Sequence, residues 1–187
     1  MTEDDYCLLK CNLLLSQLRF LQRNKQPRIA AFRRLRLVRA CVRGDGRNIL
    51  ISHGRRDMPT PLEIVRATYE GSSEENGRNL LAALAPDAEW TEAAGFPYAG
   101  TYIGPENIIK NVHQRLGSEW QGYRADVDHF YDAGDNVIAQ GFYHGTYRAT
   151  GKAFSASFAH IYTVRAGKIV KFVQIVDSAK VLEAMQP

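Results

Sequence analysis

The sequence predicts an α+β fold, with helices in the first half of the folded region and strands in the second. Three segments between Thr60 and about Leu116 have apolar residues at helical spacing, whereas residues 123–177 contain runs rich in β-branched and aromatic residues. Short connections that each contain a glycine join these runs, which favours an antiparallel meander. The absence of helical crossovers between the strands argues against a parallel βαβ fold.

Three helices are predicted before the sheet. Thr60-Pro61-Leu62-Glu63 supplies an N-cap, a proline at the first helical position and an acidic first turn, which opens a helix to about Tyr69. A second helix covers Glu74–Ala85 and ends at Pro86. The third opens at Gly104-Pro105-Glu106 and runs to about Leu116.

The segment between the second and third helices contains a short predicted strand, Ala88–Thr91, and an irregular stretch over residues 92–103. Four longer strands follow at Tyr123–Tyr131, Asn136–Tyr147, Lys152–Arg165 and Lys168–Asp177. The last two flank a tight Ala166-Gly167 turn, and Ser178–Met185 then forms a short helix.

The final hairpin has one face that mixes apolar and polar side chains. Period-two alternation places on it Phe154, Ala156, Phe158, His160, Tyr162 and Val164 from one strand, and Val170, Phe172, Gln174 and Val176 from the other. Polar side-chain groups within an otherwise apolar face are typical of a ligand pocket. They are also typical of a core whose polar groups form hydrogen bonds with one another.

This hairpin resembles the C-terminal signature of SnoaL-like proteins, the polyketide cyclase and ketosteroid isomerase branch of the nuclear transport factor 2-like superfamily. The matching residues are His160-x-Tyr162-x-Val164, then Gly167-Lys168-Ile169, and the closing Val176-Asp177. The resemblance extends back to about Thr60. It implies a cone-shaped, curved antiparallel sheet wrapped around the helices, an apolar small molecule as ligand or substrate, and a homodimer. Members include isomerases, cyclases and non-catalytic proteins, so the fold does not decide the reaction.

The charge distribution divides the chain at about residue 57. Residues 1–57 contain thirteen Lys and Arg against five Asp and Glu, a net charge of +8, and all three cysteines. Residues 58–187 carry a net charge of −4 and sixteen of the nineteen aromatic residues. We therefore expect a SnoaL-like domain over 58–187, preceded by a basic, poorly ordered extension over 1–57.

Three interpretations of the extension remain open. Its arginines could contact phosphates, but no aromatic platform or fold motif supports nucleic acid as a partner. It could form an amphipathic helix for a membrane surface or a partner. The composition favours a third interpretation, translated upstream sequence, which makes Met58 the functional start.

Several classes of function are not indicated. No apolar run reaches the roughly 18 residues of a membrane span, and the acidic Glu3-Asp4-Asp5 start is unlike a targeting signal, so we expect a cytoplasmic protein. The five histidines lack metal-ligand spacing, and no GxGxxG, Walker or GxSxG motif is present. We therefore expect no metal and no cofactor.

Gln174 restricts the enzymatic hypotheses. The resemblance implies an acidic general base three positions before the closing Asp, where this chain has Gln174, and an amide cannot take a proton near neutral pH. His160 is then the expected proton carrier, because its ordinary pKa lies near 6.5. Asp177 is a second catalytic candidate, although an Asp before a helix is commonly its N-cap.

The remaining candidates would line the pocket. They are Trp90, Tyr98, His113, Tyr162 and Phe172, together with Gln174. The aromatic residues suit an apolar ligand but could equally be core residues, and surface exposure is the simpler expectation for His113. Two hypotheses follow: a cofactor-free acid–base isomerase, cyclase or lyase, and a non-catalytic protein with the same pocket.

Overall fold

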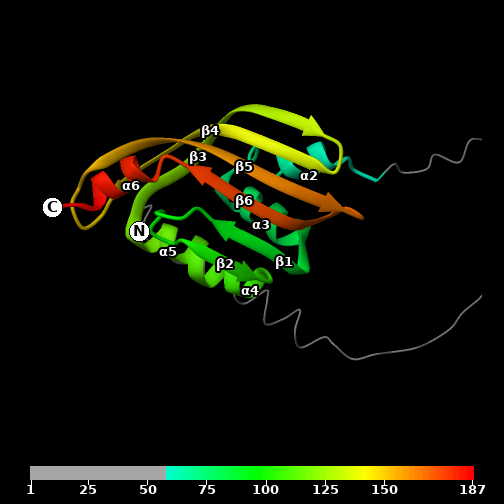
Figure 1. The fold of residues 1–187 in the computed structure, drawn as a ribbon, viewed down its shortest axis with the longest axis horizontal. Coiled ribbons are helices and arrows are strands. Elements are labelled where there is room, and N and C mark those ends of the chain that lie inside the picture. The colour runs from blue at the N-terminus through cyan, green and yellow to red at the C-terminus, as the bar shows by residue number, and fades with distance from the viewer. Residues whose placement is uncertain (1–57) are drawn as a thin grey trace, which may run out of the picture.

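The structure is a computed structural model that describes residues 58–187, and the predictions made for residues 1–57 lie outside the described part (Figure 1). In chain order the elements are α2 (Pro61–Arg66), α3 (Ser73–Ala83), β1 (Leu84–Glu92), β2 (Gly100–Ile103), α4 (Pro105–Ile108), the π-helix η1 (Ile109–His113), α5 (Gln114–Glu119), β3 (Trp120–Ala133), β4 (Asn136–Tyr147), β5 (Ala153–Arg165), β6 (Lys168–Val176) and α6 (Ser178–Met185). The α+β class is confirmed. No helix among residues 58–187 is long and apolar enough to cross a membrane.

Capping boxes fix the starts of the first two helices. The Thr60 side chain accepts a hydrogen bond from the Glu63 backbone, and the Glu63 side chain bonds the Thr60 backbone in return. Ser72 and Glu75 do the same for α3. The third predicted helix is present, but five of its residues, Ile109–His113, adopt a π-helical turn.

The sheet is mixed, which corrects the expectation of a purely antiparallel one. Its strand order is β2-β1-β6-β5-β4-β3, and β1 pairs in parallel with β6 while all other neighbours are antiparallel. The stretch over residues 92–103, expected to be irregular, contains β2 at the edge of the sheet. Pairing between β1 and β6 joins residues about eighty positions apart, and local patterns carry no signal for it.

Strand β3 bends beside β4, where its register shifts between Val127 and His129. The backbones are so close there that a Cβ at Gly141 would lie 1.9 Å from the Asp126 carbonyl oxygen. Glycine therefore permits the approach that bends the end of the sheet over α2 (Figure 1).

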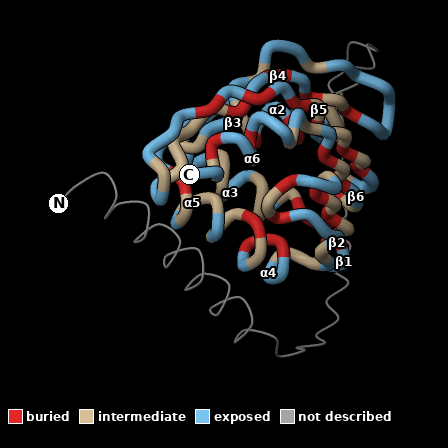
Figure 2. The backbone as a smooth tube through the Cα atoms, turned by 60° about the vertical axis from the view of Figure 1, so that its left-hand side comes forward, coloured by how far each residue is buried: buried red, intermediate tan, exposed pale blue. Residues whose placement is uncertain are grey.

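The buried residues lie on the inner face of the curved sheet and beneath the helices (Figure 2). One cluster, which includes Trp90, Tyr162 and Phe172, packs under α2 and α4. The other includes Tyr98, Trp120 and Tyr143 and extends to α6. The expected inward face of β5 is confirmed, because every second residue from Phe154 to Val164 is buried.

Candidate functional site

A chain of hydrogen-bonded side chains runs through the interior where the two clusters meet. His160 on β5 lies opposite Gln174 on β6, as the strand register requires. Tyr143 on β4 and Tyr162 on β5 belong to the two different clusters, and Tyr69 follows the end of α2. The site therefore draws on three neighbouring strands and on the helix that covers them.

The contacts are continuous from the backbone of Ala93 to Tyr162. Ala93 N–H donates to Gln174 Oε1 (3.1 Å), and Gln174 Nε2 donates to the Tyr143 hydroxyl (3.0 Å). The Tyr143 hydroxyl bonds His160 Nε2, while His160 Nδ1 bonds the Tyr69 hydroxyl at 2.5 Å. The Tyr69 hydroxyl also lies 2.5 Å from that of Tyr162. We call these five residues the relay: Gln174, Tyr143, His160, Tyr69 and Tyr162.

His160 is neutral at physiological pH. Burial, and to a lesser degree the nearby His113, lowers its pKa from 6.5 to about 3. An imidazole that cannot gain a proton near neutrality does not act as the cationic acid, which argues against the proton-carrying role expected from its ordinary pKa. Its two ring nitrogens instead hold two tyrosine hydroxyls in place.

Glu92, which sequence reasoning missed, is the buried group with a pKa suited to acid–base work. It is 4% exposed at the end of β1, and burial raises its pKa from 4.5 to about 7. Trp90 Nε1 donates to Glu92 Oε1 at 2.7 Å, whereas Glu92 Oε2 has no partner among the described residues. A sequence signal existed, because Ala88, Trp90 and Glu92 alternate on one face of the strand.

Two further polar atoms are buried without a hydrogen-bond partner among residues 58–187. They are His113 Nε2 and the Tyr123 hydroxyl. Burial lowers the pKa of His113 to about 4, and its ring packs edge-on against Trp90 at 5.7 Å. The His113 side chain is thus partly buried with its Nε2 enclosed, which corrects the expectation of exposure. Unpaired buried polar atoms are uncommon, and together with Glu92 Oε2 they mark the interior as a place for a polar ligand atom.

The predicted aromatic residues are distributed over both clusters. Trp90 stacks on Phe172 with ring centroids 3.6 Å apart, because the parallel register of β1 and β6 places them side by side. Tyr162 is part of the relay. These residues line the side of the interior that contains Glu92.

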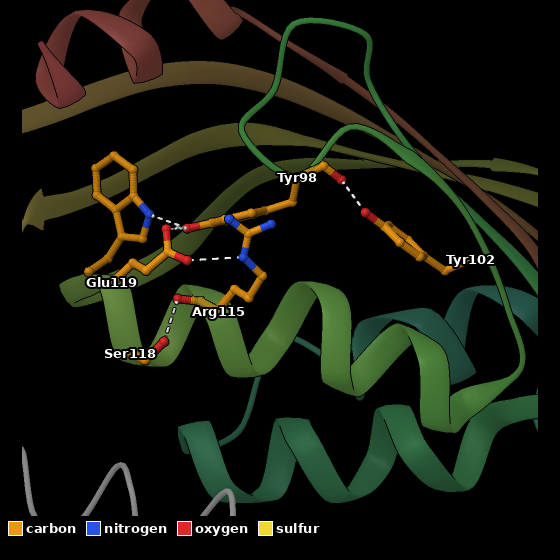
Figure 3. Close-up of polar contacts among 6 residues, drawn as sticks. Tyr98, Tyr102, Arg115, Ser118 and Glu119 are labelled. Carbon is orange, nitrogen blue, oxygen red and sulfur yellow. Dashed lines mark hydrogen bonds and ion pairs between the residues drawn. The ribbon is translucent and has the colours of Figure 1, made fainter.

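Tyr98 has no hydrogen bond to the relay in the structure and belongs to the polar group that Figure 3 shows. Its hydroxyl donates to Glu119 (2.8 Å) and accepts from Trp120 Nε1 (2.9 Å), while the Arg115 guanidinium lies 4.2 Å from its ring centre. Arg115 also pairs with Glu119. Since these groups satisfy one another, Tyr98 ties the loop between β1 and β2 to the end of α5 and to Trp120, which matches the core alternative for this residue.

Asp177 is exposed and lies outside the relay. Its side chain accepts a hydrogen bond from Lys180 N at 3.4 Å and caps α6. This position supports the N-cap interpretation over the catalytic one.

A groove of about 570 Å³ lies between α2 and the bent part of β3. Leu62, Arg66, Tyr69 and Glu70 form one wall, and residues 125–130 form the other. Tyr69 therefore contacts both the groove and, through its hydroxyl, His160. The volume is within the usual range for small-molecule sites.

Among residues 58–187, no three His, Cys, Asp or Glu side chains gather closely enough to hold a metal ion.

Comparison with known proteins agrees with this geometry. Residues 65–172, more than half of the chain, match the model of the SnoaL-like domain. No curated protein matches. A solved NTF2-like protein from Burkholderia thailandensis E264 is 50% identical, with a TM-score of 0.67, and the match covers 70% of this chain and all of that one.

Two more distant structures share the fold. An NTF2-like protein of unknown function from Burkholderia pseudomallei K96243 is 25% identical over 70% of this chain and all of that one (TM-score 0.62). TerC, co-crystallised with polyporic acid, is 25% identical over 68% of this chain and 98% of its own (TM-score 0.60). The chain therefore belongs to the SnoaL-like domain family and has the NTF2-like fold.

Proposed function

We propose that the protein binds an uncharged, apolar carbonyl compound in its interior and catalyses a cofactor-free proton transfer on it, as an isomerase, cyclase or lyase does. The observation that carries this proposal is the buried Glu92, whose pKa of about 7 leaves both protonation states populated near neutral pH. A base is most effective when its pKa lies near the working pH.

The free oxygen of Glu92 supports the role of base. Trp90 occupies Oε1 and fixes the carboxyl group, while Oε2 is left to accept a proton from carbon. A general base must reach the proton that it removes, so an oxygen with no competing partner is an advantage.

The tyrosines supply the complementary donors. Burial raises the pKa of Tyr143, Tyr69 and Tyr162, and all three remain neutral hydroxyls. Hydroxyl donors in a dry interior stabilise the negative charge that develops on a carbonyl oxygen when the adjacent carbon loses its proton. The relay contains no cationic side chain, which favours an uncharged substrate over a phosphate or carboxylate.

The groove between α2 and β3 is the route that we assign to the ligand, because Tyr69 connects it to His160. The co-crystallisation of TerC with polyporic acid supports a small-molecule ligand in this fold. A homodimer through the outer face of the sheet stays a prediction, which the exposed Phe142 and Ile175 support.

The test is deuterium uptake at carbons next to the carbonyl group in a panel of mono- and polycyclic ketones, followed by NMR. Ketone binding is measured separately through tryptophan fluorescence, which Trp90 should report. Glu92→Gln keeps the oxygen that accepts from Trp90 but cannot take a proton, so uptake should fall by about 10²–10⁴-fold. Glu89→Gln, on the same strand but half-exposed and paired with Lys171, is the matched control and should leave uptake unchanged.

The outcomes separate the two hypotheses. Uptake that is equally fast in Glu92→Gln would show that Glu92 is not the base. Ketones that bind without any uptake would favour the alternative, a non-catalytic binding protein. That alternative is supported by Gln174, an amide at the position where the resemblance implies an acidic base.

A further inference from the structure

The part of the relay made by His160 and the three tyrosines contains one more mobile hydrogen than it has hydrogen-bonded links. Three tyrosine hydroxyls and one N–H of the neutral imidazole supply the hydrogens, and the links are Tyr143–His160, His160–Tyr69 and Tyr69–Tyr162. A link is satisfied when one hydrogen lies in it. One hydrogen is therefore always left over.

Three arrangements satisfy all three links. In the first, Tyr143 donates to Nε2, the Nδ1–H donates to Tyr69, and Tyr69 donates to Tyr162, which leaves the Tyr162 hydrogen free. In the second every bond is reversed, the imidazole carries Nε2–H, and the Tyr143 hydrogen is free. In the third, Nδ1–H and Tyr162 both donate to Tyr69, whose own hydrogen then has no further partner among the described residues. The tautomer of His160 therefore reports whether the free hydrogen is that of Tyr143.

Gln174 distinguishes the second arrangement from the other two. Its Oε1 must accept from the backbone N–H of Ala93, which fixes the amide orientation and turns Nε2 toward Tyr143. Tyr143 oxygen thus always accepts one bond from Gln174. In the second arrangement it would accept two, and its own hydrogen would turn to the neighbouring Tyr123 hydroxyl, whose hydrogen would then have no partner among the described residues.

The surroundings of Tyr162, at the other end of the relay, favour the first arrangement as well. The Thr68 side chain lies against the Tyr162 hydroxyl, and Thr68 Oγ1 already donates its hydrogen to the Val65 carbonyl at 2.7 Å. The Thr68 oxygen is therefore left to accept the free hydrogen of Tyr162. The first arrangement satisfies every hydroxyl of the relay, whereas the second and the third each leave a buried donor unpaired, which is costly.

We propose that Gln174 is a positioning residue that holds ligand-free His160 as the Nδ1–H tautomer, and that an oxygen acceptor bound at Tyr143 reverses the whole relay. The ligand-free part of this proposal rests on the hydrogen-bond geometry alone. Only its consequence, that Tyr143 becomes the donor to a substrate oxygen, rests on the proposed function. The proposal gives the amide at position 174 a role that a carboxylate could not fill. An ionised carboxylate would accept a hydrogen bond from Tyr143 and so enforce the reversed arrangement.

The test is ¹⁵N NMR of the full-length, histidine-labelled protein without ligand, with His160→Gln as the reference that identifies the His160 signals. Protonated and unprotonated ring nitrogens have well-separated shifts, so the tautomer is read directly. The wild-type protein should show Nδ1 protonated and Nε2 unprotonated. The opposite pattern would overturn the proposal.

Two variants test the direction of the relay. In Gln174→Glu the two shifts should exchange between the nitrogens once the new carboxyl ionises, followed from pH 6 to pH 10. Tyr162→Phe removes the acceptor at the far end and should move His160 toward Nε2–H in a chain that keeps Gln174. Tyr102→Phe removes a hydroxyl that donates to the Tyr98 backbone carbonyl, outside the relay, and should change nothing. An unchanged tautomer in both Gln174→Glu and Tyr162→Phe would also overturn the proposal. That failure would leave the proposed function untouched, because the deuterium uptake into ketones that tests Glu92 is a separate measurement.

Discussion

Glu92 should make the folded protein less stable as the pH rises, and Glu92→Gln should remove that effect. Its pKa is raised from 4.5 to about 7, so between these values the folded state binds more protons than the unfolded state. The free energy of unfolding therefore falls as pH rises through this window. Each unit of pKa difference is worth about 1.4 kcal/mol, which gives about 3 kcal/mol above pH 8 for this buried group.

The assay is urea unfolding of the wild-type protein and Glu92→Gln between pH 5 and pH 8.5. The amide keeps the acceptor for Trp90 and the shape of the side chain, so the comparison isolates the charge. The stability advantage of Glu92→Gln should grow from about 1 kcal/mol at pH 5 to about 3 kcal/mol at pH 8.5. Histidine contributions are common to both proteins and cancel in the difference.

Glu89→Gln is the control for a charge on the same strand. Its side chain is 44% exposed and pairs with Lys171 at 2.8 Å, so the change should cost less than about 1 kcal/mol at any pH. A Glu92→Gln difference that stays constant over the whole range would refute the reasoning, because it would mean that Glu92 is as easily ionised in the folded state as in the unfolded chain.

The buried histidines should produce the opposite slope in acid. His160 and His113 have pKa values lowered from 6.5 to about 3 and about 4, so the unfolded state binds more protons below pH 6.5, and stability is lost as pH falls toward those values. His113→Leu should remove about 3 kcal/mol of that loss and so shift the midpoint of acid unfolding to lower pH. Circular dichroism during an acid titration measures this midpoint. An unchanged midpoint would show that His113 is not buried in a neutral form.

The sequence identified most elements because their signals are local. The capping box at Thr60, the glycine turns and the alternation along β5 each depend on neighbouring residues. The π-helical turn and the parallel pairing of β1 with β6 were not predictable in the same way. Both depend on how distant parts of the chain pack together.

The site was predicted in part. His160, Tyr162 and Gln174 follow from the alternation of the last hairpin, and the structure brings them into one relay. Tyr69 and Tyr143 come from a helix end and from another strand, and only the folded structure shows that they meet His160. Glu92 was missed although its strand alternates clearly, because a lone acidic residue before an irregular stretch resembles an exposed one. Its burial, and hence its raised pKa, is a tertiary property.

The ionisation of Glu92 is the most direct measure of the proposed chemistry. In a protein labelled with ¹³C at the glutamate carboxyl carbons, the signal missing from Glu92→Gln identifies Glu92, and its shift is followed from pH 4 to pH 9. The structure predicts a midpoint at about 7, well above the ordinary value of 4.5. A midpoint at or below that ordinary value would contradict the assignment of Glu92 as the base of this site.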